Sequence, residues 1–148
     1  MKRISLLAAA LWLGGCTATL APEPALQDTA VSDRLAGSRW RVETIAGKPL
    51  PASIESTVEF GPDGRLFGMA GCNRYRGRYR LDGDTLQVQQ LVTTRKLCFP
   101  TIMIHEQSLL RVLQGARRIE REQGQLLLES RNEQGVSRMA AIDVPEQG

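Results

Sequence analysis

The chain has 148 residues, of which 19 are lysine or arginine and 16 are aspartate or glutamate. This length suffices for one domain of ordinary size and for little more. The positive excess belongs in part to the first residues, because removing Lys2 and Arg3 leaves 17 basic residues against 16 acidic ones. The balance removes the main support for nucleic acid as a partner, since nucleic-acid-binding proteins carry a strong, localised positive charge.

The N-terminal residues have the pattern of a bacterial export signal. Two basic residues precede an apolar run from Ile4 to Leu13, which is too short to span a bilayer because a spanning helix needs about 20 apolar residues. The run ends in Leu13-Gly14-Gly15-Cys16, which resembles the lipobox, where small residues admit the signal peptidase and the cysteine thiol accepts a diacylglyceryl group. We expect residues 1–15 to be a lipoprotein signal peptide and Cys16 to be lipidated. The alternative is an ordinary secretory signal followed by an incidental thiol.

Residues 16–37 have the composition of a flexible tether. Ala, Pro, Thr, Asp and Ser predominate there, and the apolar residues show little periodicity. Stable lipid anchoring needs more than one acyl chain, which bacterial lipoproteins normally carry on this cysteine. The residue after Cys16 is Thr17 rather than aspartate, which favours sorting to the outer membrane. We therefore expect the protein to lie on the periplasmic face of that membrane.

One domain is expected from residue 38 to residue 143, followed by a tail at 144–148. Alternating polar and apolar residues predict antiparallel strands, which turn sequences such as Asp82-Gly83 and Gln123-Gly124 separate. The expected strands cover 39–45, 57–60, 65–69, 75–81, 85–91, 118–122, 125–130 and 136–142. Their regular spacing predicts a mainly β (α+β) fold, with an antiparallel curled sheet or small barrel.

One segment, from Ile102 to Gln114, has helical rather than strand periodicity. Its apolar residues recur on one face, with Leu109 and Leu113 among them. Pro100 lies where a helix can begin, and Gly115 is placed to end the helix in a left-handed conformation. We expect one amphipathic helix packed on the sheet.

Three cysteines are present. If Cys16 carries lipid, Cys72 and Cys98 remain as an even pair in an oxidising compartment. A disulfide closing a loop of this length would stabilise the fold by roughly 3–4 kcal/mol in the chain-entropy model. The alternative is a pair of free, buried thiols.

A family resemblance emerges around the first of these two cysteines. The sequence Gly71-Cys72-Asn73-Arg74-Tyr75, followed by Gly77 and Tyr79, resembles the signature of the META domain, a family that includes the HslJ-like heat-shock lipoproteins. Further matching positions are Trp40, Phe60, Thr94 and Glu106. The segment Thr94-Arg95-Lys96-Leu97-Cys98 departs from the family pattern by its basic residues. The resemblance implies a compact β-rich fold with a helix, an envelope role in heat or antibiotic stress, and no enzymatic activity. Some members resemble small lipoproteins that escort secretion-system components.

Four arginines alternate with apolar or small residues along one expected strand. Because side chains on a strand point to alternate faces, Arg74, Arg76, Arg78 and Arg80 share one face. One interpretation is a solvated outer face with carboxylates opposite on neighbouring strands. The other is a basic surface for anionic lipid or the phosphates of lipopolysaccharide, since guanidinium groups bind phosphate in bidentate fashion.

Glu106 lies in the middle of the apolar face of the expected helix. A carboxylate in that position must find partners or stay protonated. We expect a structural clamp that accepts hydrogen bonds from the Trp40 indole, an arginine or free backbone N–H groups. A ligand-binding role is the alternative.

Nothing in the sequence favours catalysis, a metal or a cofactor. His105 is the single histidine, so a zinc site with several histidines is excluded. The segment from Gly68 to Asn73 contains two glycines but lacks the lysine and the hydroxyl residue of a phosphate-binding loop. We expect a non-enzymatic module that binds another envelope protein or the membrane surface. A carrier of a small apolar ligand is the alternative, and a roomy barrel interior would support it.

Overall fold

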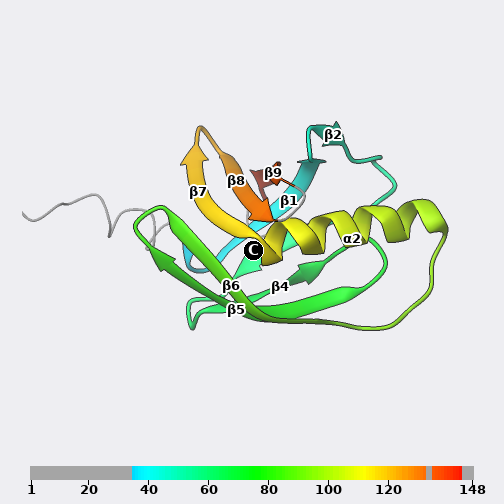
Figure 1. Ribbon diagram of the computed structural model, residues 1–148, viewed down its shortest axis with the longest axis horizontal. Coiled ribbons are helices and arrows are strands. Elements are labelled where there is room, and N and C mark those ends of the chain that lie inside the picture. Colours follow the sequence, from blue (N-terminus) through cyan, green and yellow to red (C-terminus); the bar gives the residue numbers. More distant parts are fainter. Residues whose placement is uncertain (1–34, 133–134, 145–148) are drawn as a thin grey trace, which may run out of the picture.

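The computed structural model describes residues 35–132 and 135–144 of the chain. The expected signal peptide, Cys16 and nearly all of the expected tether therefore lie outside the described residues. The elements are β1 (Ser38–Ile45), β2 (Lys48–Pro49), β3 (Thr57–Phe60), β4 (Arg65–Met69), β5 (Arg74–Asp82), β6 (Thr85–Thr93), α2 (Pro100–Gln114), β7 (Ala116–Glu122), β8 (Gln125–Asn132) and β9 (Gly135–Asp143) (Figure 1). Every strand and the helix expected from the sequence are present. Only the short β2 was not foreseen.

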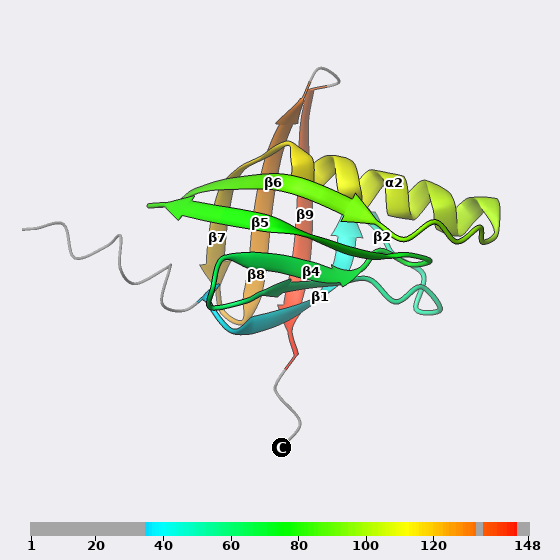
Figure 2. The ribbon, with the colours of Figure 1, turned by 90° about the horizontal axis from the view of Figure 1, so that it is seen from below.

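The strands form one antiparallel sheet that closes on itself. The order runs from β1 through β3, β4, β5, β6, β7 and β8 to β9, and β9 pairs again with β1. Figure 2 shows β4, β5 and β6 crossing over β7, β8 and β9, so the barrel is flattened into two layers. The expected mainly β fold is confirmed, as a closed barrel of eight strands to which β2 is attached at the edge of β1.

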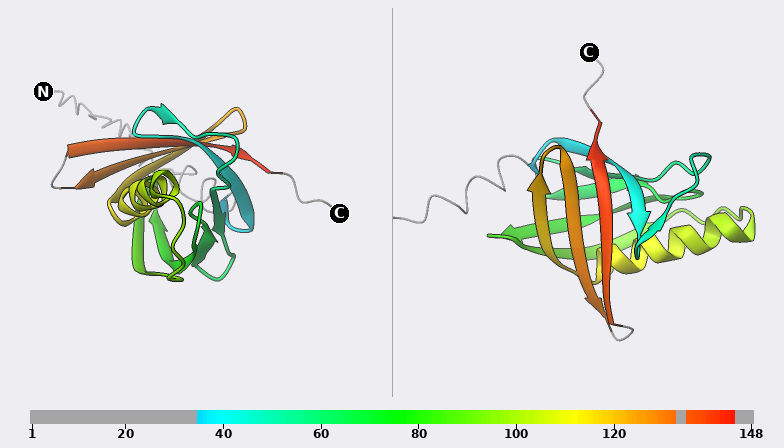
Figure 3. Two further views of the ribbon diagram at one scale, coloured as in Figure 1. Left: turned by 90° about the vertical axis from the view of Figure 1, so that its right-hand side faces the viewer. Right: turned by 90° about the horizontal axis from the view of Figure 1, so that it is seen from above.

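The barrel is weakest where β6 meets β7. Thr85 and Arg118 are the one residue pair in register there, and the Ile119 N–H donates to the Asp84 carbonyl at 2.9 Å. The connection between these two strands contains α2, which packs against β6, β8, β1 and β9. Viewed end-on, the helix lies between the two layers (Figure 3, left). It thus fills the opening that the short β6–β7 contact leaves.

Large side chains fill the interior of the barrel. Trp40, Phe60 and Leu86 from the strands and Leu109 and Leu113 from α2 are each 1 % exposed or less. Side chains at this degree of burial pack about as densely as an organic crystal. The interior of the barrel is therefore a packed core, which argues against a carrier that holds its ligand inside a hollow barrel.

The helix does not end as expected. Gly115 has φ −90° and ψ 6°, so the prediction of a left-handed conformation was wrong. Space still favours glycine, because a Cβ at this position would lie 3.2 Å from the Arg131 carbonyl oxygen and 3.3 Å from that of Arg111, so that the main chain would have to shift slightly. The Arg131 N–H donates to the Gly115 carbonyl at 2.9 Å. Close approach of β8 to the helix end, rather than backbone conformation, explains the residue.

Candidate functional site

The residues of the expected signature begin in the turn between β4 and β5. The Ala70 N–H donates to the Asn73 carbonyl at 2.8 Å, which closes the turn. Gly71 has φ +104°, and a Cβ there would lie 3.1 Å from a methyl group of Ile54 and 3.2 Å from one of Ile102. Both the backbone conformation and the space therefore require glycine at this position. The turn packs directly against the start of α2.

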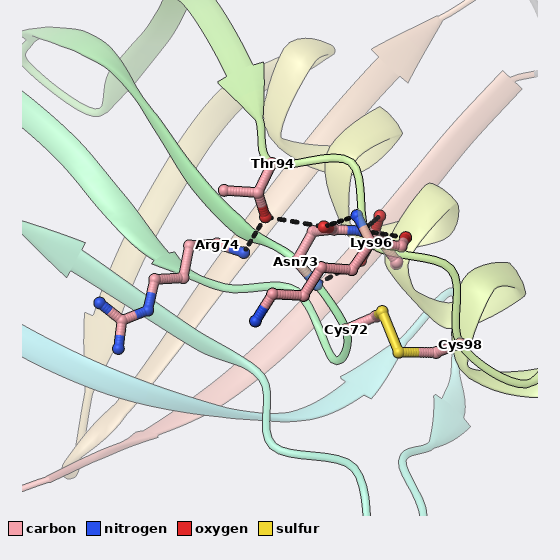
Figure 4. The surroundings of a disulfide bond; sticks show 7 residues. Cys72, Asn73, Arg74, Thr94, Lys96 and Cys98 are labelled. Atoms are coloured by element: carbon pink, nitrogen blue, oxygen red, sulfur yellow. Dashed lines mark hydrogen bonds between the residues drawn. A yellow bond between two sulfur atoms is a disulfide. The ribbon is translucent and has the colours of Figure 1, made fainter.

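Asn73 is the centre of a buried hydrogen-bond network. Its Oδ1 accepts from the Thr94 hydroxyl and from the Lys96 N–H, each at 2.7 Å, and its Nδ2 donates to the Lys96 carbonyl at 3.0 Å. Figure 4 shows the side chain lying between these two residues. The side chain is thus saturated with partners. It holds the segment after β6 against the start of β5.

Glu106 completes this network from the helix. It is 5 % exposed. Its Oε2 accepts from the Asn73 N–H at 2.7 Å and its Oε1 from Asn73 Nδ2 at 2.9 Å. A backbone N–H is therefore one of its partners, but the Trp40 indole is not, since it donates to the Ser38 hydroxyl at 2.7 Å. This geometry is that of a clamp between α2 and β5.

Cys72 and Cys98 form a disulfide, with their Cα atoms 6.0 Å apart. The bond joins the β4–β5 turn to the residue just before Phe99, where α2 begins (Figure 4). Cys72 is buried and Cys98 is exposed. The predicted pairing is confirmed, and the alternative of two free buried thiols was wrong.

The other signature residues face inward from β5. Tyr75 is buried and its hydroxyl donates to the Thr57 carbonyl at 2.7 Å, while the Tyr79 hydroxyl donates to the Gly61 carbonyl at 3.0 Å. Burial, followed by the negative charge of Glu59, raises the pKa of Tyr75 well above its ordinary value. A Cβ on Gly77 would lie 2.9 Å from the Gln89 carbonyl oxygen. The two tyrosines thus tie β5 to β3 and to the turn that follows β3, and Gly77 lets β6 approach closely.

Trp40 lies in the barrel core, away from the Asn73 network. Its indole is fully buried, and the Arg121 guanidinium lies 4.9 Å from the ring centroid. That guanidinium also pairs with Asp143 at 3.0 Å. A cation over an indole face is attracted by the ring quadrupole. Trp40 therefore links β1 to β7 near the closure of the barrel.

The four arginines of β5 lie on the outer face of the barrel. All are exposed, whereas the residues between them are buried or half-buried. Among the residues that the structure describes, no carboxylate lies within 4.0 Å of any of these guanidinium groups. Six other arginines of the barrel do have such partners: Arg39, Arg41, Arg65, Arg118, Arg121 and Arg138. A solvated face with carboxylates opposite the arginines on neighbouring strands was one of the two interpretations, and the described residues do not supply those carboxylates.

Uncharged or basic residues stand opposite these arginines instead. Arg76 lies between Phe67 on β4 and Val92 on β6, and Arg78 lies opposite Arg65. Phe67 is 38 % exposed and Val92 is 51 % exposed. We define the arginine face as Arg74, Arg76, Arg78 and Arg80 with Phe67 and Val92. It combines unpaired cations with accessible apolar surface.

Two shallow depressions lie on the arginine face. The larger, of about 800 Å³, is lined by four cations, Arg39, Arg74, Arg76 and Lys96, by two carboxylates, Glu55 and Glu59, and by apolar residues that include Phe67 and Val92. The smaller, of about 590 Å³, extends along Arg76 and Arg78. Both contain Arg76 between the two apolar side chains. Their chemistry suits an anionic group attached to apolar matter.

No cluster of three or more metal-binding side chains occurs within residues 35–132 and 135–144. In the same part of the chain, no helix is long and apolar enough to cross a membrane. His105 lies on α2 next to Glu106 in sequence, and Glu106 is occupied by Asn73. The described residues thus offer no assembled donor set for a metal ion.

Sequence reasoning missed two features of this region. One is the main chain of Lys96, which both donates to and accepts from Asn73. No residue type marks a main-chain partner, so no signal was available. The other is the exposure of Leu97 and Phe99, for which the basic departure from the family pattern beside them was the available signal.

Comparisons with known proteins agree with this architecture. No curated protein matches the chain. An NMR structure of a protein from Burkholderia xenovorans is similar at a TM-score of 0.62 and 18% identity, covering 90% of this chain and 100% of that one. A crystal structure of a DUF4847 family protein from Bacteroides vulgatus has a TM-score of 0.56 at 16% identity, covering 79% of this chain and 99% of that one. These likenesses show the fold alone.

The family model of the META domain matches residues 33–142. The chain therefore belongs to the META domain family.

Proposed function

We propose that this META-domain protein is a lipid-anchored, non-catalytic binding module on the periplasmic face of the outer membrane. Its task is to support the envelope under heat or antibiotic stress. The arginine face is its contact surface for phosphate groups, either of anionic lipid or of lipopolysaccharide.

The unpaired arginines carry this proposal. A guanidinium group on a protein surface commonly takes a carboxylate partner, as six arginines of this barrel do. Four neighbouring arginines on one strand without such partners repel one another, and anionic groups relieve that repulsion. Each basic side chain near an anionic membrane contributes about 1 kcal/mol of attraction. The face therefore suits a surface with closely spaced phosphates.

Two further observations support the location and the absence of catalysis. The motif ending in Cys16 is typical of lipoproteins, and a structural disulfide is typical of proteins in oxidising compartments such as the periplasm. The signature residues Asn73, Tyr75 and Tyr79 use their polar atoms in packing contacts. Their side chains are thus committed to holding the fold together rather than to a reaction.

Substitution of all four arginines by glutamine tests the arginine face. The mature chain carrying Cys16→Ser, which lacks acyl chains, is mixed with vesicles of phosphatidylglycerol or of lipopolysaccharide at low salt. We expect the Arg74, Arg76, Arg78 and Arg80→Gln variant to bind at least about 100-fold more weakly in sedimentation, since four contacts are lost. In cells, the same variant on the lipidated chain should lower survival under heat or antibiotic.

A matched control removes the same charge elsewhere. Arg41, Arg118, Arg131 and Arg138→Gln changes the net charge equally, and none of these four exposed residues lines either depression of the arginine face. This control should bind clearly better than the variant of the arginine face. Equal loss in the two variants would show that net charge alone attracts the chain. Unaltered binding in the arginine-face variant would refute the proposed contact surface.

A further inference from the structure

The segment between β6 and α2 carries two large apolar side chains that point into solvent. Leu97 is 93 % exposed and Phe99 is 79 % exposed, more than any other large hydrophobic residue in the described part of the chain. Ile104, on the second turn of α2, is 61 % exposed. Figures 1 and 2 show the start of α2 and the segment before it extending beyond the strands. These apolar side chains thus belong to a part of the structure that projects from the barrel.

The segment is attached to the barrel on both sides of Leu97. Lys96 is tied to the barrel by two main-chain hydrogen bonds with Asn73, at 2.7 and 3.0 Å. Cys98 is tied to it by the disulfide with Cys72. Leu97 lies between these two attachments and Phe99 follows the second. Their exposure is therefore built into the structure and does not arise from a free loop.

The charge around these two residues is positive. Arg95 and Lys96 precede Leu97, and no acidic residue occurs from 94 to 105. Arg74 lies beside the segment, because its N–H donates to the Thr94 hydroxyl at 3.2 Å and its carbonyl accepts from the Thr94 N–H at 3.0 Å. The nearest acidic residue along the helix, Glu106, is buried against Asn73. Arg95, Lys96 and Arg74 thus flank the apolar residues on their N-terminal side, although Glu55 and Glu59 share a depression with Arg74 and Lys96.

This combination fits a bilayer better than a protein partner. A stable protein–protein interface buries about 1,200–2,000 Å², far more than two or three side chains supply. Insertion of a few apolar side chains between phosphates needs no such area. A lipid anchor also keeps the chain beside the membrane, so that a weak second contact is strengthened by effective concentration.

We propose that residues 94–99 form a membrane-contact tip for an anionic phospholipid bilayer. Leu97 and Phe99 enter the interface between headgroups and acyl chains, while Arg95 and Lys96 contact lipid phosphates. The proposal deepens the envelope function given above and rests on it for the nearby membrane. It differs from the arginine face by being an inserting contact, so the two are separable by insertion depth and by salt.

A tryptophan reporter measures insertion directly. Phe99→Trp is placed in the mature lipidated chain, reconstituted through Cys16 on phosphatidylglycerol vesicles, with labelled palmitate verifying the anchor. Trp40 is fully buried and gives a constant background. We expect the emission of Trp at position 99 to shift to shorter wavelength and to be quenched by brominated acyl chains. A matched reporter at Val136, a site 53 % exposed on β9, should show neither change.

A second variant measures the apolar contribution. In the Cys16→Ser chain, Leu97→Ser with Phe99→Ser should weaken vesicle binding by about 10- to 100-fold, since two apolar side chains lose their burial. This loss should persist at high salt, where the contribution of the arginine face is screened. Solvent-like emission at position 99 on anchored vesicles would overturn the tip while leaving the arginine face standing. A shift that occurs without vesicles and grows with protein concentration would also overturn it, in favour of self-association.

Discussion

At the scale of single residues, Asn73 links three parts of the chain. Its side chain and N–H bond Glu106 on α2, and its amide group bonds Thr94 and the Lys96 main chain. The asparagine itself lies at the junction with β5. Loss of this side chain leaves the buried Glu106 Oε1 and the part-buried Thr94 hydroxyl and Lys96 main chain without these partners, and a buried group left unsatisfied costs about 1–3 kcal/mol.

We expect Asn73→Ala to lower the free energy of unfolding by about 3 kcal/mol, since Glu106 Oε1 and the Lys96 main chain lose their partners, whereas Glu106 Oε2 keeps the N–H of residue 73. Urea denaturation followed by far-ultraviolet circular dichroism measures the change. Gln87→Ala, at an exposed position on β6, serves as the control and should be nearly neutral. A loss below about 1 kcal/mol for Asn73→Ala would mean that the network adds little to stability.

Tyr75 makes stability sensitive to alkaline pH. Its pKa in the folded state is raised, by burial first and by Glu59 second, above the ordinary value of 10.0. Below pH 10 both states keep the proton, so stability is unaffected. Between the unfolded and the folded pKa only the unfolded state releases the proton, and stability falls as pH rises.

The free energy of unfolding should therefore decline from about pH 10 upward. Tyr75→Phe should show a shallower decline, together with a loss of about 1 kcal/mol at neutral pH from the missing hydrogen bond to Thr57. Denaturation curves at several pH values for both chains measure the difference. Identical slopes would assign the alkaline sensitivity to other groups, with Tyr79 the next to test, since its pKa is also raised by burial and by Asp63.

At the scale of elements, the disulfide secures the connection that leads into α2. Cys72→Ala with Cys98→Ala should lower the free energy of unfolding by about 3 kcal/mol. The barrel strands should still pair, because their hydrogen bonds do not depend on the bond between the sulfurs. Urea denaturation with and without reductant measures the effect. Reduced wild-type protein should resemble the double variant, and a large difference between them would point to strain introduced by the substitutions.

Element positions were predictable where one local pattern decides them. Period-two alternation and the glycine turns located the strands, and helical periodicity placed Glu106 on the buried face of α2. Gly115 was misjudged because periodicity locates the end of a helix but not its neighbours, and the approaching β8 main chain decides that residue. The Cys72–Cys98 pairing followed from the number of cysteines, whereas the Lys96 contacts had no residue signal.

The same limit applies to the candidate site. Alternation along β5 predicted a shared face for its arginines, and the exposure pattern agrees. Whether carboxylates stand opposite depends on register, and register is set by long-range pairing. It was the pairing of β5 with β4 and β6 that placed Phe67 and Val92 beside Arg76. The accessible apolar part of the arginine face could therefore not be predicted from the sequence.

At the scale of the whole molecule, the proposed lipid anchor, the arginine face and the membrane-contact tip would act together. The interior of the barrel is filled, so the proposed recognition would take place on its outside. The arginine face and the tip adjoin at Arg74, which belongs to the first and lies beside the second. Basic and apolar side chains of both regions therefore lie close together on the outside of the barrel. A membrane-bound barrel would therefore have a preferred orientation.

The pairing of the first long strand with the last has a consequence for biogenesis. β1 lacks its partner β9 until the end of the chain is present, so a chain that emerges from its N-terminus cannot complete the barrel early. Until β9 pairs with β1, the unpaired edge of β1 and the Trp40 indole can make non-native contacts. Such long-range closure is also slow compared with local folding. If the chain is exported as proposed, it would therefore cross the membrane before the barrel closes, and the barrel would close only when β9 arrives.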